Sequence, residues 1–141
     1  MNHASKHTFS PRSLTEKELS FARWLIEHSD ASGEETKKYL GQLEAASVVG
    51  MCECGCASID FAIAGAASEA GAPMNPFGDF MTKDRRFGVY VFSKRDTLAG
   101  VEIYSLSDLD LPSEFPSPNE LVTVEGGQQG GTANSLRSPL T

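Results

Sequence analysis

The stretch Ser58-Ile59-Asp60-Phe61-Ala62-Ile63 places a large apolar side chain at every second position. Successive side chains of a β-strand point to opposite faces of a sheet, so Ile59, Phe61 and Ile63 share one face. A period of two predicts a strand with one face buried against a core.

Three further segments predict strands that pair with this one. Residues 47–53 are rich in Val and lead into a turn at residues 54–57. Residues 87–92 and 98–105 are rich in β-branched and aromatic side chains, which fit a pleated, half-buried surface. Four consecutive strands, two of them separated only by the turn at residues 94–97, predict an antiparallel meander.

Residues 64–80, between the second and third expected strands, are rich in Gly, Ala, Pro and Asn. These residue types favour turns and irregular backbone, so the segment is interpreted as a loop. Its exposed apolar side chains are expected to be Met74, Phe77 and Phe80. A mobile loop without a specific role is one interpretation, and a lid over the sheet or a docking element is the alternative.

The residues before the strands predict two helices. Thr15-Glu16-Lys17-Glu18 is a capping box, and apolar residues recur with helical spacing after it, which predicts a helix from Glu16 to about His28. Turn residues follow, and a second amphipathic helix is expected from about Glu34 to Glu44. The predicted fold class is α+β: an N-terminal helical hairpin packed on a four-stranded antiparallel meander.

The chain of 141 residues fits one domain. Residues 14–124 hold the apolar side chains and are predicted to form a single α+β domain, with disordered, flexible tails at residues 1–13 and 125–141. Prolines at three positions in residues 112–118 exclude a helix or a central strand there. We expect an extended strap instead, held by three apolar anchors: Leu111, Phe115 and Leu121.

The sequence contains no segment typical of export or of membrane insertion. The N-terminal residues lack the apolar run of a secretory signal. No stretch approaches the ~20 apolar residues of a membrane-spanning helix. The expectation is a soluble, cytoplasmic protein that does not interact with membranes.

Acidic residues dominate the charge of the chain, which is −7 at pH 7. Residues 96–125 contain no basic side chain and these carboxylates: Asp96, Glu102, Asp108, Asp110, Glu114, Glu120 and Glu125. Such a field repels nucleic-acid phosphates, which proteins bind through Lys and Arg. Nucleic acid is therefore a poor candidate partner and a basic protein is a better one; an acidic face that only keeps the protein soluble is the alternative.

The cysteines Cys52, Cys54 and Cys56 form the one unusual chemical cluster in the sequence. Cysteines two apart in an extended strand are about 7 Å apart, which is awkward for a disulfide, so all three are expected to be reduced thiols. One interpretation is that they pack as small hydrophobic side chains around a hairpin turn. The alternative is a zinc site with His28 as the fourth ligand, although zinc-binding cysteines are usually paired two to four residues apart.

Catalysis by a cysteine needs a base within hydrogen-bond reach and a third group that orients the base. The only histidines are His3, His7 and His28, and the first two lie in the expected N-terminal tail. A Cys56–His28 pair is the one Cys-centred enzyme site to consider, and it has no identified orienting partner. We therefore assign no catalytic and no cofactor-binding residues.

The chain resembles a group of small uncharacterised bacterial proteins in two places. The first is Val48-Val49-Gly50-Met51-Cys52-Glu53-Cys54-Gly55-Cys56; the second is Gly100-Val101-Glu102-Ile103-Tyr104-Ser105, which leads into Leu111-Pro112-Ser113-Glu114-Phe115-Pro116. The resemblance covers roughly residues 48–121 and implies no particular activity. Size and charge favour a non-catalytic protein-interaction domain, comparable to the immunity factors that accompany secreted toxins; a metal-binding domain and a Cys-centred enzyme are the alternatives.

Overall fold

The protein is described here by a computed structural model that places residues 10–52, 55–67, 71–107 and 111–124. The α-helices are α1 (Glu16–Glu27) and α2 (Gly33–Leu43), and a 3-10 turn, η2 (Pro118–Glu120), precedes the last strand. The strands are β1 (Arg12–Ser13), β2 (Ala46–Met51), β3 (Ile59–Ile63), β4 (Ala66–Ala67), β5 (Asn75–Thr82), β6 (Phe87–Lys94), β7 (Thr97–Ser105) and β8 (Leu121–Thr123). The fold class is α+β, as predicted.

The strands form one antiparallel eight-stranded sheet in the order β1-β2-β3-β7-β6-β5-β8, with β4 paired to β3. The predicted four-stranded meander is therefore wrong, because β3 lies beside β7 and not beside the next long strand of the chain. After β3 the chain forms the short β4 against it, next joins the sheet as β5, and runs back through β6 and β7 to reach β3 again. Only two register pairs, Ile59 with Val101 and Asp60 with Gly100, join the two halves of this sheet.

Strand β5 lies in the segment that the sequence predicts to be a loop. It contains Pro76 and Gly78, which are unfavourable in the interior of a strand. Pro76 is tolerated because β8 pairs only with the far end of β5, from Phe80 to Thr82, which leaves the first half of β5 at an edge of the sheet. Phe80 is buried and only Met74 of the three expected exposed side chains is clearly exposed.

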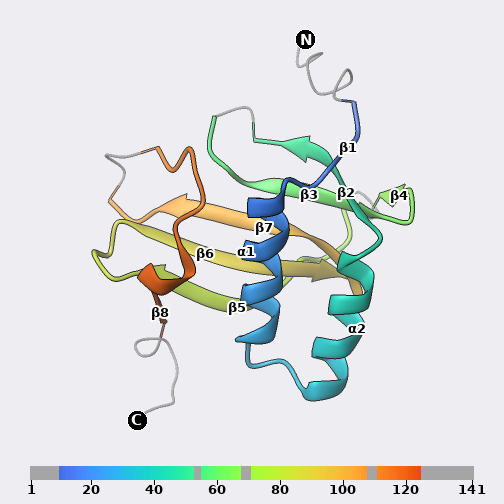
Figure 1. Cartoon of the computed structure of the whole chain (residues 1–141), viewed down its shortest axis with the longest axis horizontal. Coiled ribbons are helices and arrows are strands. Elements are labelled where there is room, and N and C mark those ends of the chain that lie inside the picture. Colours follow the sequence, from blue (N-terminus) through green and yellow to red (C-terminus); the bar gives the residue numbers. More distant parts are fainter. Residues whose placement is uncertain (1–9, 53–54, 68–70, 108–110, 125–141) are drawn as a thin grey trace.

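Both helices cover the same face of the sheet (Figure 1). Alternation along the strands turns Ile59, Phe61, Val89, Val91 and Ile103 toward the helices, where all are almost completely buried. The helices contribute apolar side chains at helical spacing to the same core: Phe21, Ala22, Leu25, Ile26, Tyr39 and Leu43. The core thus forms a single layer between the helical hairpin and one face of the sheet.

The predicted tails, residues 1–13 and 125–141, lie outside the described residues except for residues 10–13. Arg12 and Ser13 form β1, which pairs with β2, so the folded region begins before the predicted boundary at residue 14. Of the expected strap anchors, Phe115 stacks on Phe21 with ring centroids 4.7 Å apart and Leu121 is buried in β8, as predicted. Leu111 is exposed, so its assignment as an anchor is wrong.

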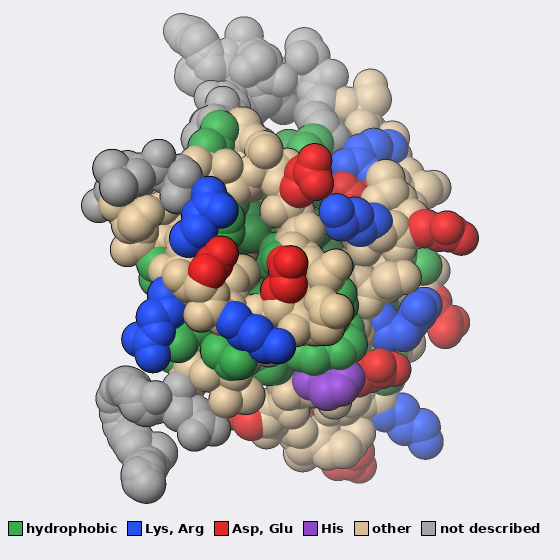
Figure 2. Space-filling view, turned by 60° about the vertical axis from the view of Figure 1, so that its left-hand side comes forward, with side chains coloured by type: hydrophobic (Ala, Val, Ile, Leu, Met, Phe, Trp, Pro, Cys, Tyr) green, Lys and Arg blue, Asp and Glu red, His purple; other side chains and the backbone are tan. Residues whose placement is uncertain are grey.

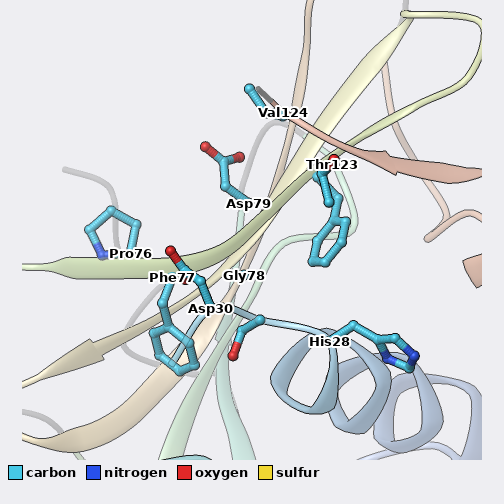
Figure 3. A pocket seen from close by; sticks show the side chains of 10 residues that line it. His28, Asp30, Pro76, Phe77, Gly78, Asp79, Thr123 and Val124 are labelled. Atoms are coloured by element: carbon cyan, nitrogen blue, oxygen red, sulfur yellow. The ribbon is translucent and has the colours of Figure 1, made fainter. Parts of the chain in front are cut away.

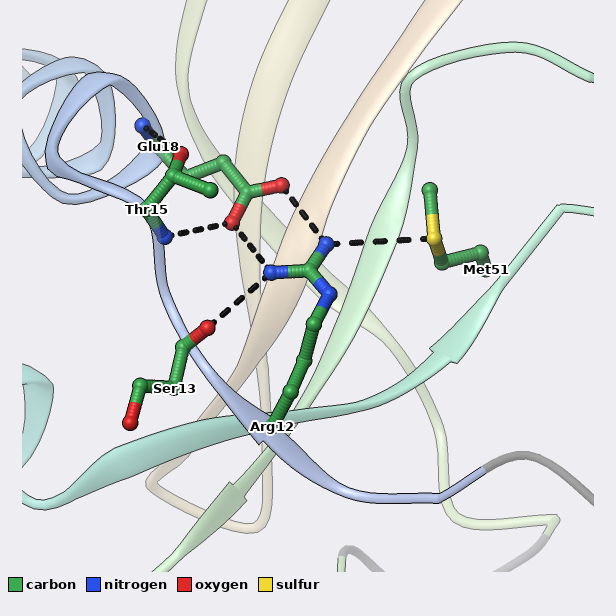
Figure 4. Close-up of polar contacts among 5 residues, drawn as sticks. All are labelled: Arg12, Ser13, Thr15, Glu18 and Met51. Atoms are coloured by element: carbon green, nitrogen blue, oxygen red, sulfur yellow. Dashed lines mark hydrogen bonds and ion pairs between the residues drawn. The ribbon is translucent and has the colours of Figure 1, made fainter.

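The start of α1 confirms the predicted capping box. The Thr15 hydroxyl accepts from the Glu18 amide at 3.0 Å, and the Glu18 carboxylate accepts from the Thr15 amide at 2.9 Å. The same carboxylate also accepts two hydrogen bonds from the Arg12 guanidinium, at 2.8 and 2.9 Å (Figure 4). Arg12 thereby ties β1 to the first turn of α1.

Replacing Arg12 with alanine should destabilise the protein by about 1 kcal/mol at neutral pH, because it leaves a partly buried Glu18 carboxylate without its cation. The Arg12 hydrogen bonds are the main reason why the pKa of Glu18 lies below its ordinary value of 4.5. A carboxyl group whose pKa is lowered in the folded state stabilises the folded protein at pH values above its unfolded pKa. This contribution is lost as the pH falls through the folded pKa. Urea denaturation at pH 7 and pH 3 should therefore show a smaller difference between the two proteins at pH 3; an unchanged difference would contradict the ion pair.

Candidate functional site

The face of the sheet that points away from the helices carries a group of carboxylates and tyrosines. We call it the open face and define it by five residues: Asp60, Asp79, Tyr90, Glu102 and Tyr104. Asp60 and Asp79 are exposed, and the other three are half-buried. Within the described parts of the chain, neither of the two helices packs on this face.

The strand register brings these side chains together. Tyr90 lies directly opposite Glu102 in the ladder between β6 and β7. On its other side the ladder between β5 and β6 is irregular between Phe77 and Phe80, a β-bulge that sets Asp79 beside Tyr90. Since neighbouring strands are about 4.8 Å apart, Tyr90 stands between two carboxylates that come from the strands on either side of it.

Glycines lie opposite the aromatic residues of the open face and leave space for their rings. The Tyr104 ring lies over Gly88, where an added Cβ would overlap the ring, and the Phe92 ring lies over Gly100. The centroid of the Tyr90 ring is 6.0 Å from that of Tyr104 and 6.2 Å from that of Phe92. Three aromatic rings therefore adjoin one another on this side of the sheet: Tyr90 and Tyr104 are half-buried, and Phe92 is buried.

Burial and mutual repulsion act on the ionisable groups of the open face. Burial raises the pKa of Asp79, and the nearby carboxylate of Asp30 raises it further. Burial is also the main cause of the raised pKa of Glu102, with a smaller contribution from Asp60. Both effects disfavour the charged forms of Asp79 and Glu102, and a nearby cation would oppose them.

The two tyrosines and Asp60 show the same effects. Burial raises the pKa of Tyr90, and so do Glu102 and Asp79; burial, Asp79 and Tyr90 raise the pKa of Tyr104. Burial raises the pKa of Asp60 too, but here the ammonium group of Lys94 acts in the opposite direction. The Lys94 ammonium group therefore offsets part of the shift of Asp60, whereas the effect that offsets part of the shift of Glu102 is a hydrogen bond with Ser58.

The edge of the molecule next to β5 and β8 is different in character. In the view of Figure 2, positive and negative side chains are mixed over this side of the molecule. A hollow of about 380 Å³ lies here between the end of α1, the bulge of β5 and β8, lined by His28, Ser29, Asp30, Pro76, Phe77, Gly78, Asp79, Phe80, Thr123 and Val124. Figure 3 shows the Asp79 carboxylate on one side of β5, and Phe77, Asp30 and His28 on the other, so Asp79 belongs to the open face and not to a closed site with His28.

The acidic residues 96–125 do not form one surface. Asp96 lies in the turn between β6 and β7, with its carboxylate 3.8 Å from the Lys38 ammonium group. Glu114 lies 3.6 Å from the ammonium group of Lys17 at the start of α1. Of this stretch Glu102 is on the open face, whereas Asp108, Asp110 and Glu125 lie outside the described residues.

The expectation of three reduced thiols is wrong for Cys52, which is disulfide-bonded. The prediction assumed an extended strand through this segment. Strand β2 ends at Met51, however, and the Gly55 amide donates to the Cys52 carbonyl at 3.3 Å in a turn where Gly55 has a φ of 95°. A turn removes the separation that an extended strand would impose on neighbouring cysteines.

Cys56 is a buried thiol whose Sγ lies 3.4 Å from the Ser58 hydroxyl oxygen. Its side chain is 7 % exposed. We expect iodoacetamide to alkylate it on the order of ten- to a hundredfold more slowly in the folded protein than in guanidinium chloride, because alkylation requires local opening. Mass spectrometry of peptides from both samples measures this ratio, and equal rates would show that Cys56 is not buried.

The candidate ligand His28 lies far from the cysteine segment. It caps the end of α1, stacks on Trp24 and places its Nδ1 2.9 Å from the Trp24 carbonyl oxygen. Met51, which precedes Cys52, contacts Arg12 at the other end of α1, about 18 Å away for a helix of twelve residues. The structure thus brings neither the Cys56–His28 pair nor His28 and Cys52 together.

Within the described ranges, no three or more His, Cys, Asp or Glu side chains are grouped so that they could hold a metal ion. Cys54 lies outside those ranges, so the zinc site of Cys52, Cys54, Cys56 and His28 stays a prediction. In the described part of the chain no helix is long and apolar enough to cross a membrane. No protein-family model, curated protein or solved structure matches the chain.

Sequence reasoning did not identify the open face, although its signal is present. Alternation that turns Ile59 and Phe61 inward also turns Asp60 outward, and the same holds for Glu102 between Val101 and Ile103. The alternation within each strand does not indicate which strands are neighbours in the sheet. Asp79 could not be found in this way, because apolar and polar residues do not alternate regularly in the sequence of β5.

Proposed function

We propose that this protein is a non-catalytic interaction domain that binds a basic protein partner through the open face. One observation carries the proposal: carboxylates and tyrosines gather on the sheet face that the helices leave uncovered. An immunity factor, which binds and blocks another protein, is one class of protein that works in this way.

Two features of the open face support a protein partner. Interfaces are enriched in aromatic side chains, and Tyr90 and Tyr104 supply large, half-buried rings with polar ends. The carboxylates of Asp79 and Glu102 have raised pKa values because burial and other carboxylates disfavour their charge. Positive charge on a partner would relieve this repulsion and would speed association over a long range.

The test is affinity capture from the native cell with the full chain and two charge-matched variants. The first variant carries Asp79→Lys and Glu102→Lys on the open face; the second carries Asp96→Lys and Glu114→Lys, at exposed positions elsewhere. We expect a basic protein, recovered in stoichiometric amount by the natural chain and by the second variant but not by the first. Recovery of no stoichiometric partner, or of one that both variants bind equally, would overturn the proposal.

A further inference from the structure

Building on the proposed interaction with a basic protein, we propose that the open face recognises an arginine side chain of that partner. The guanidinium group stacks on the Tyr90 ring and donates hydrogen bonds to the carboxylates of Asp79 and Glu102.

The position of Tyr90 provides the platform for this contact. Tyr90 shares a row across the sheet with Asp79 on β5 and Glu102 on β7, so its ring has one carboxylate on each side. Each acidic residue is one strand away, about 4.8 Å between backbones. A cation over the ring therefore lies within reach of both side chains.

The residues around Tyr90 favour a planar cation. Gly88 and Gly100 contribute no side chains to the open face, and the rings of Tyr104 and Phe92 lie down over them. The Tyr90 ring is inclined to these rings by 52° and 68°, so it is not stacked in parallel on either. A guanidinium is planar, stacks on aromatic faces and donates from a rigid fork, whereas the ammonium of lysine is a compact, strongly hydrated charge.

Electrostatics select Asp79 and Glu102 rather than Asp60 as the acceptors. Lys94 already offsets part of the charge of Asp60. Burial and repulsion from Asp30 raise the pKa of Asp79. Burial and repulsion from Asp60 raise the pKa of Glu102, against a smaller opposing contribution from a hydrogen bond with Ser58. Hydrogen bonds from a guanidinium to a carboxylate are charge-assisted and are stronger than hydrogen bonds between neutral groups.

Met74 marks one border of the proposed contact. Its sulfur lies 3.6 Å from the Tyr90 hydroxyl oxygen, and its side chain is exposed. An unbranched, polarizable side chain at this place can adjust to the stem of an arginine that approaches over Tyr90. Met74 thus lies at the hydroxyl end of the Tyr90 ring, and the carboxylates of Asp79 and Glu102 lie on either side of the ring.

The experiment is a ¹⁵N–¹H NMR titration of the full chain with three blocked tripeptides, Gly-Arg-Gly, Gly-Lys-Gly and Gly-citrulline-Gly. We expect the arginine peptide to shift amide signals of β5, β6 and β7 around Tyr90 and to bind about three- to thirtyfold more tightly than the lysine peptide, because a planar guanidinium can stack on the ring and donate to both carboxylates at once. The neutral citrulline peptide should leave these signals unchanged. Weaker binding is expected for Asp79→Asn and for Glu102→Gln, and unchanged binding for the control Asp96→Asn.

Two substitutions of Tyr90 separate recognition from folding. Tyr90→Phe keeps the ring and should keep the preference for arginine, whereas Tyr90→Leu should abolish it; the dispersion of both spectra reports whether the variants fold. Equal binding of the arginine and lysine peptides at the open face would overturn the arginine proposal and leave the basic partner standing. If neither cationic peptide shifts signals of the open face, both this inference and the proposed function fail.

Discussion

Replacing Gly100 with alanine is expected to destabilise the protein by about 3 kcal/mol or more, because the new methyl group has no space between two strands. It would overlap the carbonyl oxygen of Ile59 and lie 2.8 Å from the Phe92 ring. A carbonyl oxygen in a ladder cannot turn aside as the end of a flexible side chain can. Gly100 also belongs to one of the two register pairs that join β3 to β7, so the strain falls where the two halves of the sheet meet.

Gly41→Ala is the matched control for this prediction. Gly41 lies in α2, and nothing would come within 4 Å of an added Cβ. Alanine there should stabilise the protein by about 0.5–1 kcal/mol, because glycine is unfavourable inside a helix. Urea denaturation of both variants gives the two free energies of unfolding, and a cost for Gly100→Ala below about 1 kcal/mol would mean that the β3–β7 junction is not built as described.

The elements with regular patterns could be predicted from the sequence alone. Helix α1 follows from its capping box and from apolar side chains at helical spacing, and β3, β6 and β7 follow from their residue types and alternation. These features are local, so they are visible in a single sequence. Each of the predicted elements begins and ends within two residues of the observed one.

Strand β5 shows why the sheet as a whole could not be predicted. Its residues Pro76, Gly78 and Asp79 disfavour a strand locally, and it forms because β6 offers a partner along its length. Without β5 the chain reads as four strands in a row, which predicts a meander. The position of β3 beside β7 depends on contacts between residues about forty apart, such as Ile59 with Val101, for which the pattern of either strand gives no indication.

The same limit applies to the candidate site. Its side chains come from separate strands, and they lie together because of strand order, register and one bulge. The cysteine cluster, in contrast, is conspicuous because its members are close in sequence, whereas His28 lies at the opposite end of α1 from Met51, which precedes the cluster. In an antiparallel sheet where neighbouring strands are not consecutive in the sequence, residues far apart in the chain can lie side by side in the fold.

Gly78→Ala should cost about 2–5 kcal/mol of stability, the sum of an unfavourable backbone conformation and a steric clash. Gly78 has a φ of 62°, in the left-handed region that favours glycine. An added Cβ would lie 2.9 Å from the carbonyl oxygen of Leu25 in α1 and 3.2 Å from Ser29. The bulge of β5 therefore lets the last turn of α1 approach the sheet, and it also sets Asp79 beside Tyr90.

Gly65→Ala separates the two contributions to that cost. Gly65 has a φ of 83°, but nothing would lie within 4 Å of its added Cβ, so alanine there should cost only the backbone term of about 1–2 kcal/mol. The excess for Gly78→Ala measures how tightly α1 packs on the bulge. Because the same bulge positions Asp79, Gly78→Ala should also weaken binding of the arginine peptide at Tyr90, while Gly65→Ala should not. Equal unfolding free energies for the two variants, measured in urea, would mean that α1 does not rest on this glycine.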